Sequence, residues 1–355
     1  MYNSVGRPRF YVCTLQWLKS LGKLNVWNTG DFLVDQMRDL IGINPSHQIT
    51  LNHENTDGSN DVMVFGADVD LNTIMYPDNA FNMILGHNMY SARASCETGS
   101  SGDIWNWVGT GNYVNGAFQS GRPDYNGFSI HLDTNEQMGS AIKAETNRMQ
   151  FRFDSQLEDG SYGSGNTPPL KIGSLMFGNY YTMPHSPDLS LTQTIEYGGT
   201  TTQETRGGAT LTNSTWLSQP KWGDLGAWEL SNNGLQPFHS SGRRTWNLSF
   251  SFLDSSDILG SNSRLTKNTM ETEIAGSTFE DGDVSNNIFN YDILTDYNFY
   301  SQVIHKTAGG LPFVFQPDVN DKTNFAIASI PSNTIKLTQV SFGVYNIKLK
   351  IREIW

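Results

Sequence analysis

The sequence predicts a mainly β protein, and three observations support this. Only 16% of the 355 residues are charged, 12% are aromatic, and glycine, asparagine, serine and threonine are abundant. Such a composition favours short strands joined by many turns. Several segments also alternate apolar and polar residues, which is the period of a half-buried strand. The length allows two packed domains, each with a substantial core.

The chain divides by pattern into three parts, 1–45, 46–180 and 181–355. The first part is expected to hold short helices. The segment "TLQWLKSLGKL" repeats leucine every three residues, and Gly22 is a plausible stop. A second helix is expected in "TGDFLVDQMRDLIGINP", where Asp31 can cap its start.

The second part reads as short strands separated by polar turns. In "RMQFRFDS", Met149, Phe151 and Phe153 alternate with polar residues. The other strand candidates are "HQITLNHEN", "NMILGHNMYSARAS", "GFSIHLD" and "LKIGSLMFG". This succession is typical of a β-sandwich or jelly roll.

The third part has the strongest periodicity. One strand is predicted in "GRRTWNLSFSFLD", and its expected buried face consists of Arg244, Trp246, Leu248, Phe250 and Phe252. An amphipathic helix is predicted in "NIFNYDILTDYNFYSQVIHKTAGG", ending at the glycine pair. Its expected apolar stripe consists of Phe289, Ile293, Tyr297, Tyr300 and Ile304. Three strands follow. In the last, the alternating residues are Ile347, Leu349 and Ile351 on one face and Lys348, Lys350 and Arg352 on the other.

Two family resemblances follow from these segments. The strand ending in "ILGHN", with "MQFRFDS" and "PPLKIGSLMFGNYY" downstream, resembles the galactose-binding-like (discoidin-like) jelly roll found in many bacteriophage tail proteins. It implies a jelly-roll β-sandwich over residues 46–180. The later order of strand, helix and three strands, with "GGLPFVFQPD", is similar to the tail-tube-like domain of distal tail and tail-tip proteins. It implies a small β-barrel with one flanking helix over residues 181–355, joined to the jelly roll through a hairpin around Gly198–Gly199.

The resemblance implies a structural function. The expected protein is a non-enzymatic component of a phage tail, forming a distal-tail or baseplate ring around the DNA channel. Its expected partners are further copies of itself, in a hexamer, and other tail proteins, with DNA only as passing cargo. The expected location is the virion tail, after assembly in the host cytoplasm. Two alternatives stay open, a glycan-binding adhesin and a polysaccharide hydrolase.

Charge and cysteine content exclude other classes. A formal charge of −12 argues against a nucleic-acid-binding surface, which needs clustered Lys and Arg. The sequence shows no pattern of a secretory signal and no apolar run long enough to cross a membrane. Cys13 and Cys96 are expected to be small core residues rather than a disulfide.

No catalytic, cofactor or metal site is predicted. The common nucleophile, phosphate-loop and zinc motifs are absent from the sequence, and the seven histidines are scattered singly. The segment 52–61 has clustered oxygen ligands but lacks the spacing of a known calcium loop, so a solvated turn is the expected structure. His87, between Gly86 and Asn88, is expected to cap a turn by hydrogen bonding.

Three aromatic residues are the candidate contact surface. Trp105, Trp107 and Tyr113 occur in a Gly- and Asn-rich stretch, "SGDIWNWVGTGNYVNG", that predicts a loop or a strand edge. Large rigid apolar rings with polar tips suit a partner's pocket or a sugar ring. The favoured interpretation is that the two tryptophans fill the jelly-roll core, and contact with a subunit or neighbouring protein and glycan binding are the alternatives.

Overall fold

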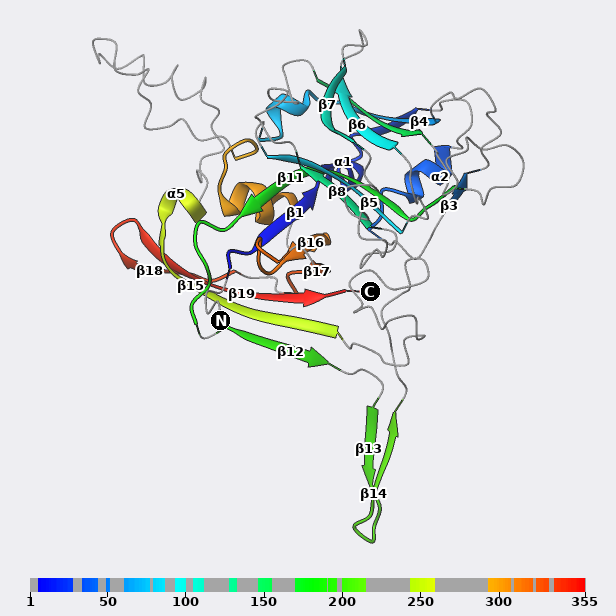
Figure 1. Cartoon of the computed structure of the whole chain (residues 1–355). Coiled ribbons are helices and arrows are strands. Elements are labelled where there is room, and N and C mark those ends of the chain that lie inside the picture. Colours follow the sequence, from blue (N-terminus) through cyan, green and yellow to red (C-terminus); the bar gives the residue numbers. More distant parts are fainter. Residues whose placement is uncertain are drawn as a thin grey trace.

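The computed structural model is a mainly β protein built from antiparallel sheets (Figure 1), as the sequence predicts. The residues that the structure describes are 6–27, 34–43, 49–51, 61–76, 79–86, 93–99, 105–111, 128–132, 146–154, 170–189, 191–196, 200–214, 243–258, 293–307, 310–321, 324–331 and 335–354.

The largest sheet has ten strands and runs through most of the molecule. Its order is β12 (Thr192–Glu196), β15 (Arg243–Asp254), β19 (Val344–Glu353), β17 (Ala326–Ser329), β16 (Phe313–Gln316), β1 (Arg9–Cys13), β11 (Ser174–Thr182), β5 (Ala80–Leu85) and β8 (Phe128–Leu132), with β18 (Leu337–Ser341) also paired to β19. Strands from all three predicted parts of the chain therefore share one sheet. The boundaries at residues 45 and 180 stay predictions.

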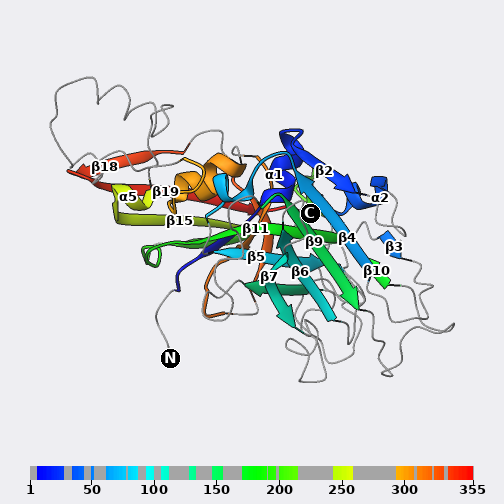
Figure 2. The same ribbon diagram turned by 90° about the horizontal axis from the view of Figure 1, so that it is seen from above.

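A second sheet of five strands faces one end of the first. Its order is β2 (Leu24–Trp27), β4 (Asp61–Ala67), β9 (Arg148–Asp154), β6 (Arg93–Gly99) and β7 (Trp105–Gly111), and Figure 2 shows it from above. Two short pairs of strands are also described: β3 (Ile49–Leu51) with β10 (Leu170–Ile172), and β13 (Thr200–Glu204) with β14 (Thr210–Ser214). The helical elements among the described residues are α1 (Thr14–Ser20), α2 (Val34–Asp39), η1 (Leu71–Thr73), α5 (Ser255–Ile258) and the π-helix η3 (Tyr300–His305).

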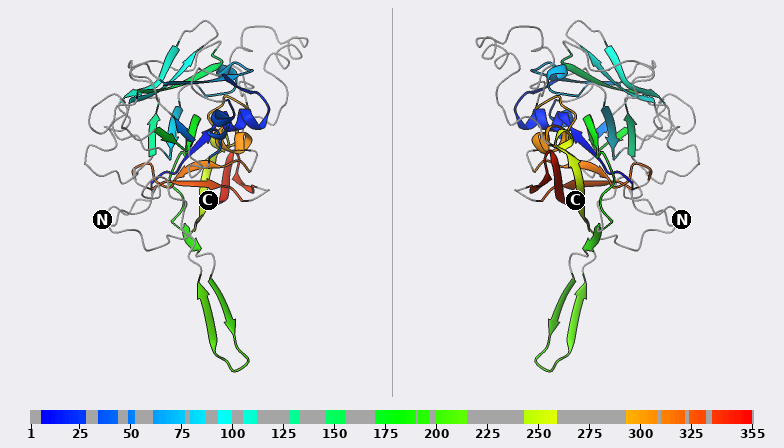
Figure 3. Two further views of the ribbon diagram at one scale, coloured as in Figure 1. Left: turned by 90° about the vertical axis from the view of Figure 1, so that its right-hand side faces the viewer. Right: turned by 90° about the vertical axis from the view of Figure 1, so that its left-hand side faces the viewer.

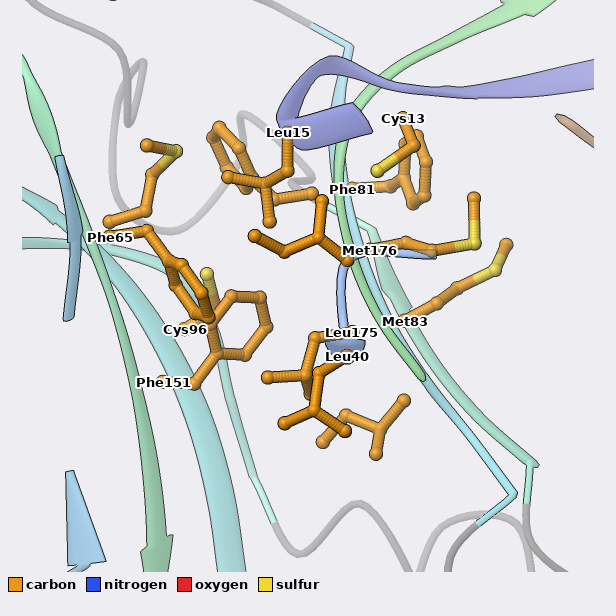
Figure 4. Close-up of a cluster of buried hydrophobic side chains, with 14 of the residues drawn as sticks. Cys13, Leu15, Leu40, Phe65, Phe81, Met83, Cys96, Phe151, Leu175 and Met176 are labelled. Atoms are coloured by element: carbon orange, nitrogen blue, oxygen red, sulfur yellow. The ribbon is translucent and has the colours of Figure 1, made fainter. Parts of the chain in front are cut away.

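The two sheets form a sandwich around one apolar core. Phe65, Cys96 and Phe151 of the five-stranded sheet belong to the same buried cluster as Leu175 of β11 and Leu15 of α1 (Figure 4). Sheets that pack face to face in this way define a β-sandwich. The jelly-roll prediction is therefore confirmed, and so is the prediction that Cys13 and Cys96 are buried free thiols.

Strand β1 contributes to two cores because its residues alternate between the faces of the large sheet. Tyr11 belongs to the sandwich core, whereas Phe10 belongs to a second core beneath β15 and β19. The Phe10 ring lies 5.4 Å from Phe299 and 5.2 Å from Phe315. All five residues of β1 are buried or half-buried.

The barrel expected in the C-terminal half does not close among the described strands. The large sheet is open, and its path ends in β12 on one side and β8 on the other. The second core nevertheless contains the predicted apolar faces of β15 and β19. Its members from these two strands are Trp246, Leu248, Phe250, Leu253, Ile347, Leu349 and Ile351.

Phe252 is a correction to the predicted face of β15. Its side chain is 79% exposed. The pairing of β15 with β19 shifts between Phe250 and Leu253, so a β-bulge interrupts the alternation, and Phe252 has a φ of 60°. Its amide donates to Asn346 Oδ1 at 3.0 Å, which holds this conformation.

The helix predicted within residues 288–310 is shorter than expected. Residues 293–295 form turns, and η3 begins only at Tyr300. Asn298 Oδ1 accepts the amide of Ser301 at 2.8 Å and so marks the start. Tyr300, expected on the apolar stripe, is 36% exposed, while Phe299 and Val303 are buried instead.

The pair β13–β14 projects from the body as a two-stranded hairpin (Figure 3). Every residue from 201 to 213 is exposed. The described turn of this hairpin spans residues 205–209, where Thr205 Oγ1 accepts the amide of Ala209 and Gly208 has a φ of +80°. The hairpin expected around Gly198–Gly199 falls at residues 197–199, outside the described residues.

Candidate functional site

The predicted contact residues Trp105 and Trp107 lie in β7, the outermost strand of the five-stranded sheet. Strand β7 pairs with β6, and Trp105 stands opposite Gly99 while Trp107 stands opposite Glu97. Tyr113 is not among the described residues. The structure thus brings the two tryptophans together on one strand edge.

The register of β6 identifies which face of the sheet is the core. Cys96 and Thr98 are buried, and Cys96 pairs with the buried Phe151 of β9. Because successive positions of a strand alternate between faces, and Thr98 pairs with Asn106, positions 105 and 107 belong to the face opposite the core. The side chains of β7 lie outside the described part of the structure, so their contact role stays a prediction.

Two other predicted features fall partly in the described residues. Gly86 follows β5 with a φ of 64°, in the left-handed region that favours glycine. His87 and Asn88 lie beyond the described residues, as does most of the calcium candidate at 52–61.

Tyr181 and Asp257 form a small group of titratable residues at the start of α5. Tyr181 donates its hydroxyl to the backbone oxygen of Asp257 at 2.9 Å, and burial raises the pKa of that hydroxyl. Burial also raises the pKa of the Asp257 carboxyl, and the negative charge of Asp254 raises it further. Because the Tyr181 hydroxyl is hydrogen-bonded to the backbone, this group is structural.

Replacing Asp257 with Asn should therefore change the pH dependence of stability. A carboxyl whose pKa is raised by folding stabilises the folded state at low pH, and that contribution is lost as pH rises through the folded-state pKa. We therefore expect Asp257→Asn to be more stable relative to the wild type at pH 7 than at pH 4, that is, the unfolding free energy of the variant minus that of the wild type should be larger at pH 7. Urea unfolding at both values tests this, with the exposed Asp35→Asn as control. An equal difference at the two pH values would contradict it.

A fully buried lysine, Lys306, directly follows helix η3. Lys306 donates to Gln302 Oε1 at 2.9 Å and lies 3.5 Å from Asn179 Oδ1 on β11. Burial lowers the pKa of the neighbouring His305, and the positive charge of Lys306 lowers it further. π-Helical turns often occur at functional sites. Here the lysine is enclosed, so it links η3 to the large sheet instead of meeting a ligand.

The described residues contain no group of three or more His, Cys, Asp or Glu able to hold a metal ion. Within that same part of the chain, no helix has the length and apolar character needed to cross a membrane.

Comparison with known proteins gives matches among solved structures alone. No protein-family description matches the chain, and no curated protein matches it. The CBM32-3 module of a family 31 glycoside hydrolase from Clostridium perfringens is 16% identical, with a TM-score of 0.30; the match covers 44% of this chain and 92% of that one. CpGH89CBM32-6, produced by Clostridium perfringens, is 13% identical with a TM-score of 0.26, covering 44% and 92% of the two chains. The CBM32-1, CBM32-2 and M60 catalytic domains of ZmpB from the same organism are 12% identical with a TM-score of 0.28, covering 48% and 15%.

These findings correct the predicted phage-tail function. The matched structures are CBM32 modules from glycoside hydrolases and from ZmpB, and none is described as a tail or baseplate protein. The described strands also form an open sheet rather than the closed barrel of a ring domain. The part of the resemblance that holds is the β-sandwich of two antiparallel sheets around one core.

Proposed function

We propose that the protein is a glycan-binding module that acts by binding and not by turnover. The supporting observation is the register of β7, which assigns positions 105 and 107 to the face of the five-stranded sheet opposite the core. Positions two residues apart on a strand share one face and are about 7 Å apart, so the proposal is that the Trp105 and Trp107 rings serve as a pair of apolar platforms. Such platforms suit the apolar faces of sugar rings.

Replacing both tryptophans by alanine should lower glycan affinity by at least about tenfold, since aromatic anchors dominate binding energy in such sites. The measurement is affinity electrophoresis of the full-length protein in gels that contain neutral polysaccharides, together with a glycan array. The control is Phe342→Ala, which removes an aromatic side chain that is 98% exposed at the β18–β19 turn.

Two results would contradict the proposal. One is a wild-type protein that binds no glycan on the array. The other is a Trp105→Ala/Trp107→Ala variant that retains wild-type affinity, because the ligand would then bind elsewhere. Release of reducing sugar from a retained polysaccharide would show turnover and favour a hydrolase. The full chain is required, because β11 of the jelly roll pairs with β1 and β1 pairs with β16.

A further inference from the structure

A second surface with binding character lies on the outer face of β12, β15 and β19 in the large sheet, whereas β7 belongs to the five-stranded sheet at the other end of the molecule (Figure 1). The inner residues of β15 and β19 fill the second core. The outer residues of β15 and β19 are polar: Asn247, Lys348 and Lys350 are exposed and Ser249 is half-buried. We call this surface the polar sheet face.

Cross-strand pairing arranges these side chains in rows. Thr192 of β12 stands opposite Asn247 of β15, and Asn247 stands opposite Lys350 of β19. Ser249 stands opposite Lys348 in the next row. Because neighbouring strands lie about 4.8 Å apart, each row places hydroxyl or amide groups beside an ammonium group.

The charge on this face is unequally compensated. Arg352 Nη2 contacts Glu196 Oε2 at 2.7 Å, so that cation is neutralised. Among the described contacts, Lys348 and Lys350 have no carboxylate partner. In a chain with a formal charge of −12, two adjacent cations without a partner form a local site for an anion.

We propose that the polar sheet face binds an anionic polysaccharide. The two lysines project from the same strand about 7 Å apart and would pair with successive acidic groups. The neighbouring Ser, Asn and Thr side chains can both donate and accept hydrogen bonds, as a hydroxylated ligand requires.

Other polyanions fit this face less well. A protein partner would need aromatic or aliphatic anchors, and the rows of Thr192, Asn247, Ser249 and the two lysines supply none. Duplex DNA needs many cations to displace its counterions. The inference uses the geometry of this face alone and does not depend on the role of Trp105 and Trp107.

The test compares polymers that share a backbone and differ in charge. Full-length protein is run in native gels that contain dextran sulfate or uncharged dextran. We expect dextran sulfate to retard the protein, with an affinity that falls as NaCl is raised. The variant Lys348→Gln/Lys350→Gln should lose about tenfold in affinity. The matched control is Lys23→Gln/Arg206→Gln, which changes the net charge equally at two exposed positions elsewhere and should bind as the wild type does.

Three outcomes would overturn the proposal. Equal retardation by dextran and dextran sulfate would show that charge is not recognised. Equal loss in both double variants would show a general charge effect. Displacement of dextran sulfate by low concentrations of poly-glutamate would show an acidic-peptide site. The Trp105→Ala/Trp107→Ala variant separates the two proposals, because it should lose neutral-glycan binding and keep dextran sulfate binding.

Discussion

Deleting residues 346–355 is expected to prevent the chain from folding. The deletion removes most of β19, which lies inside the large sheet and pairs with β15, β17 and β18. Ile347, Leu349 and Ile351 are 1%, 3% and 0% exposed. Burying three such side chains contributes roughly 1.5–3 kcal/mol each, against a total stability of about 5–15 kcal/mol for a typical domain.

The measurement is circular dichroism and limited proteolysis of the truncated chain. The control is deletion of the β13–β14 hairpin, residues 200–214, which removes more residues but none that belongs to either core. The hairpin deletion should leave the unfolding midpoint close to that of the wild type. If the C-terminal deletion also leaves a cooperative unfolding transition at the wild-type midpoint, β19 is peripheral and this account of the second core is wrong.

The alternation of apolar and polar residues predicted which side chains of β15 and β19 face the core, because successive side chains of a strand point to opposite faces of the sheet. The prediction was wrong at Phe252, because a β-bulge shifts the pairing of β15 with β19 there, and the local sequence contains no signal for the bulge. It also overextended the helix before Tyr300. There, the spacing of apolar residues suggested one continuous apolar stripe. The helix instead begins near Asn298, whose side-chain oxygen accepts the amide of Ser301.

Long-range pairing could not be predicted from the sequence. Strand β1 lies between β16 and β11, so its partners come from segments about 300 and 170 residues further along the chain. This pairing fuses the predicted parts into one open sheet. The tail-tube resemblance relied on the order of elements, and order does not determine whether strands close into a barrel.

The candidate site stays a prediction. The unusual pair of tryptophans in a Gly- and Asn-rich stretch drew attention to Trp105 and Trp107, and the register of β6 adds only that their positions belong to the face opposite the core. Lys348 and Lys350 were recognised as the polar side of the last strand. Their rows with Asn247 and Thr192 depend on pairing with β15 and β12, which one sequence does not show.

The pairing register also explains a buried ion pair. Arg244 falls on the apolar face of β15 and Glu353 on the apolar face of β19, and each would be unfavourable there alone. Thr245 stands opposite Arg352, so the next residue on each strand, Arg244 and Glu353, comes to the same place on the sheet. Arg244 Nη2 lies 2.9 Å from Glu353 Oε1, and the two side chains are 14% and 1% exposed.

Further contacts satisfy the guanidinium and the carboxylate. Arg244 donates its backbone amide and Nε to Glu353 Oε2, and its Nη1 and Nη2 to Asn324 Oδ1 and the backbone oxygen of Phe325. The guanidinium also lies 5.1 Å from the centre of the Trp246 ring. The pair therefore fixes β15, β19 and the start of β17 relative to one another.

Replacing Glu353 with alanine should lower the unfolding free energy by about 3–5 kcal/mol, because it leaves a buried guanidinium without its counter-charge. The matched control is Glu196→Ala, which breaks the Arg352 pair between β12 and β19, where both side chains are about two-fifths exposed (39% and 42%). A pair this exposed contributes at most about 1 kcal/mol. Urea unfolding of both variants at pH 7 measures the difference, and Glu353→Gln, which keeps the size and one acceptor, should fall between them. Equal losses in Glu353→Ala and Glu196→Ala would show that burial does not set the strength of the Arg244 pair, and that the β15–β19 register is held by apolar packing alone.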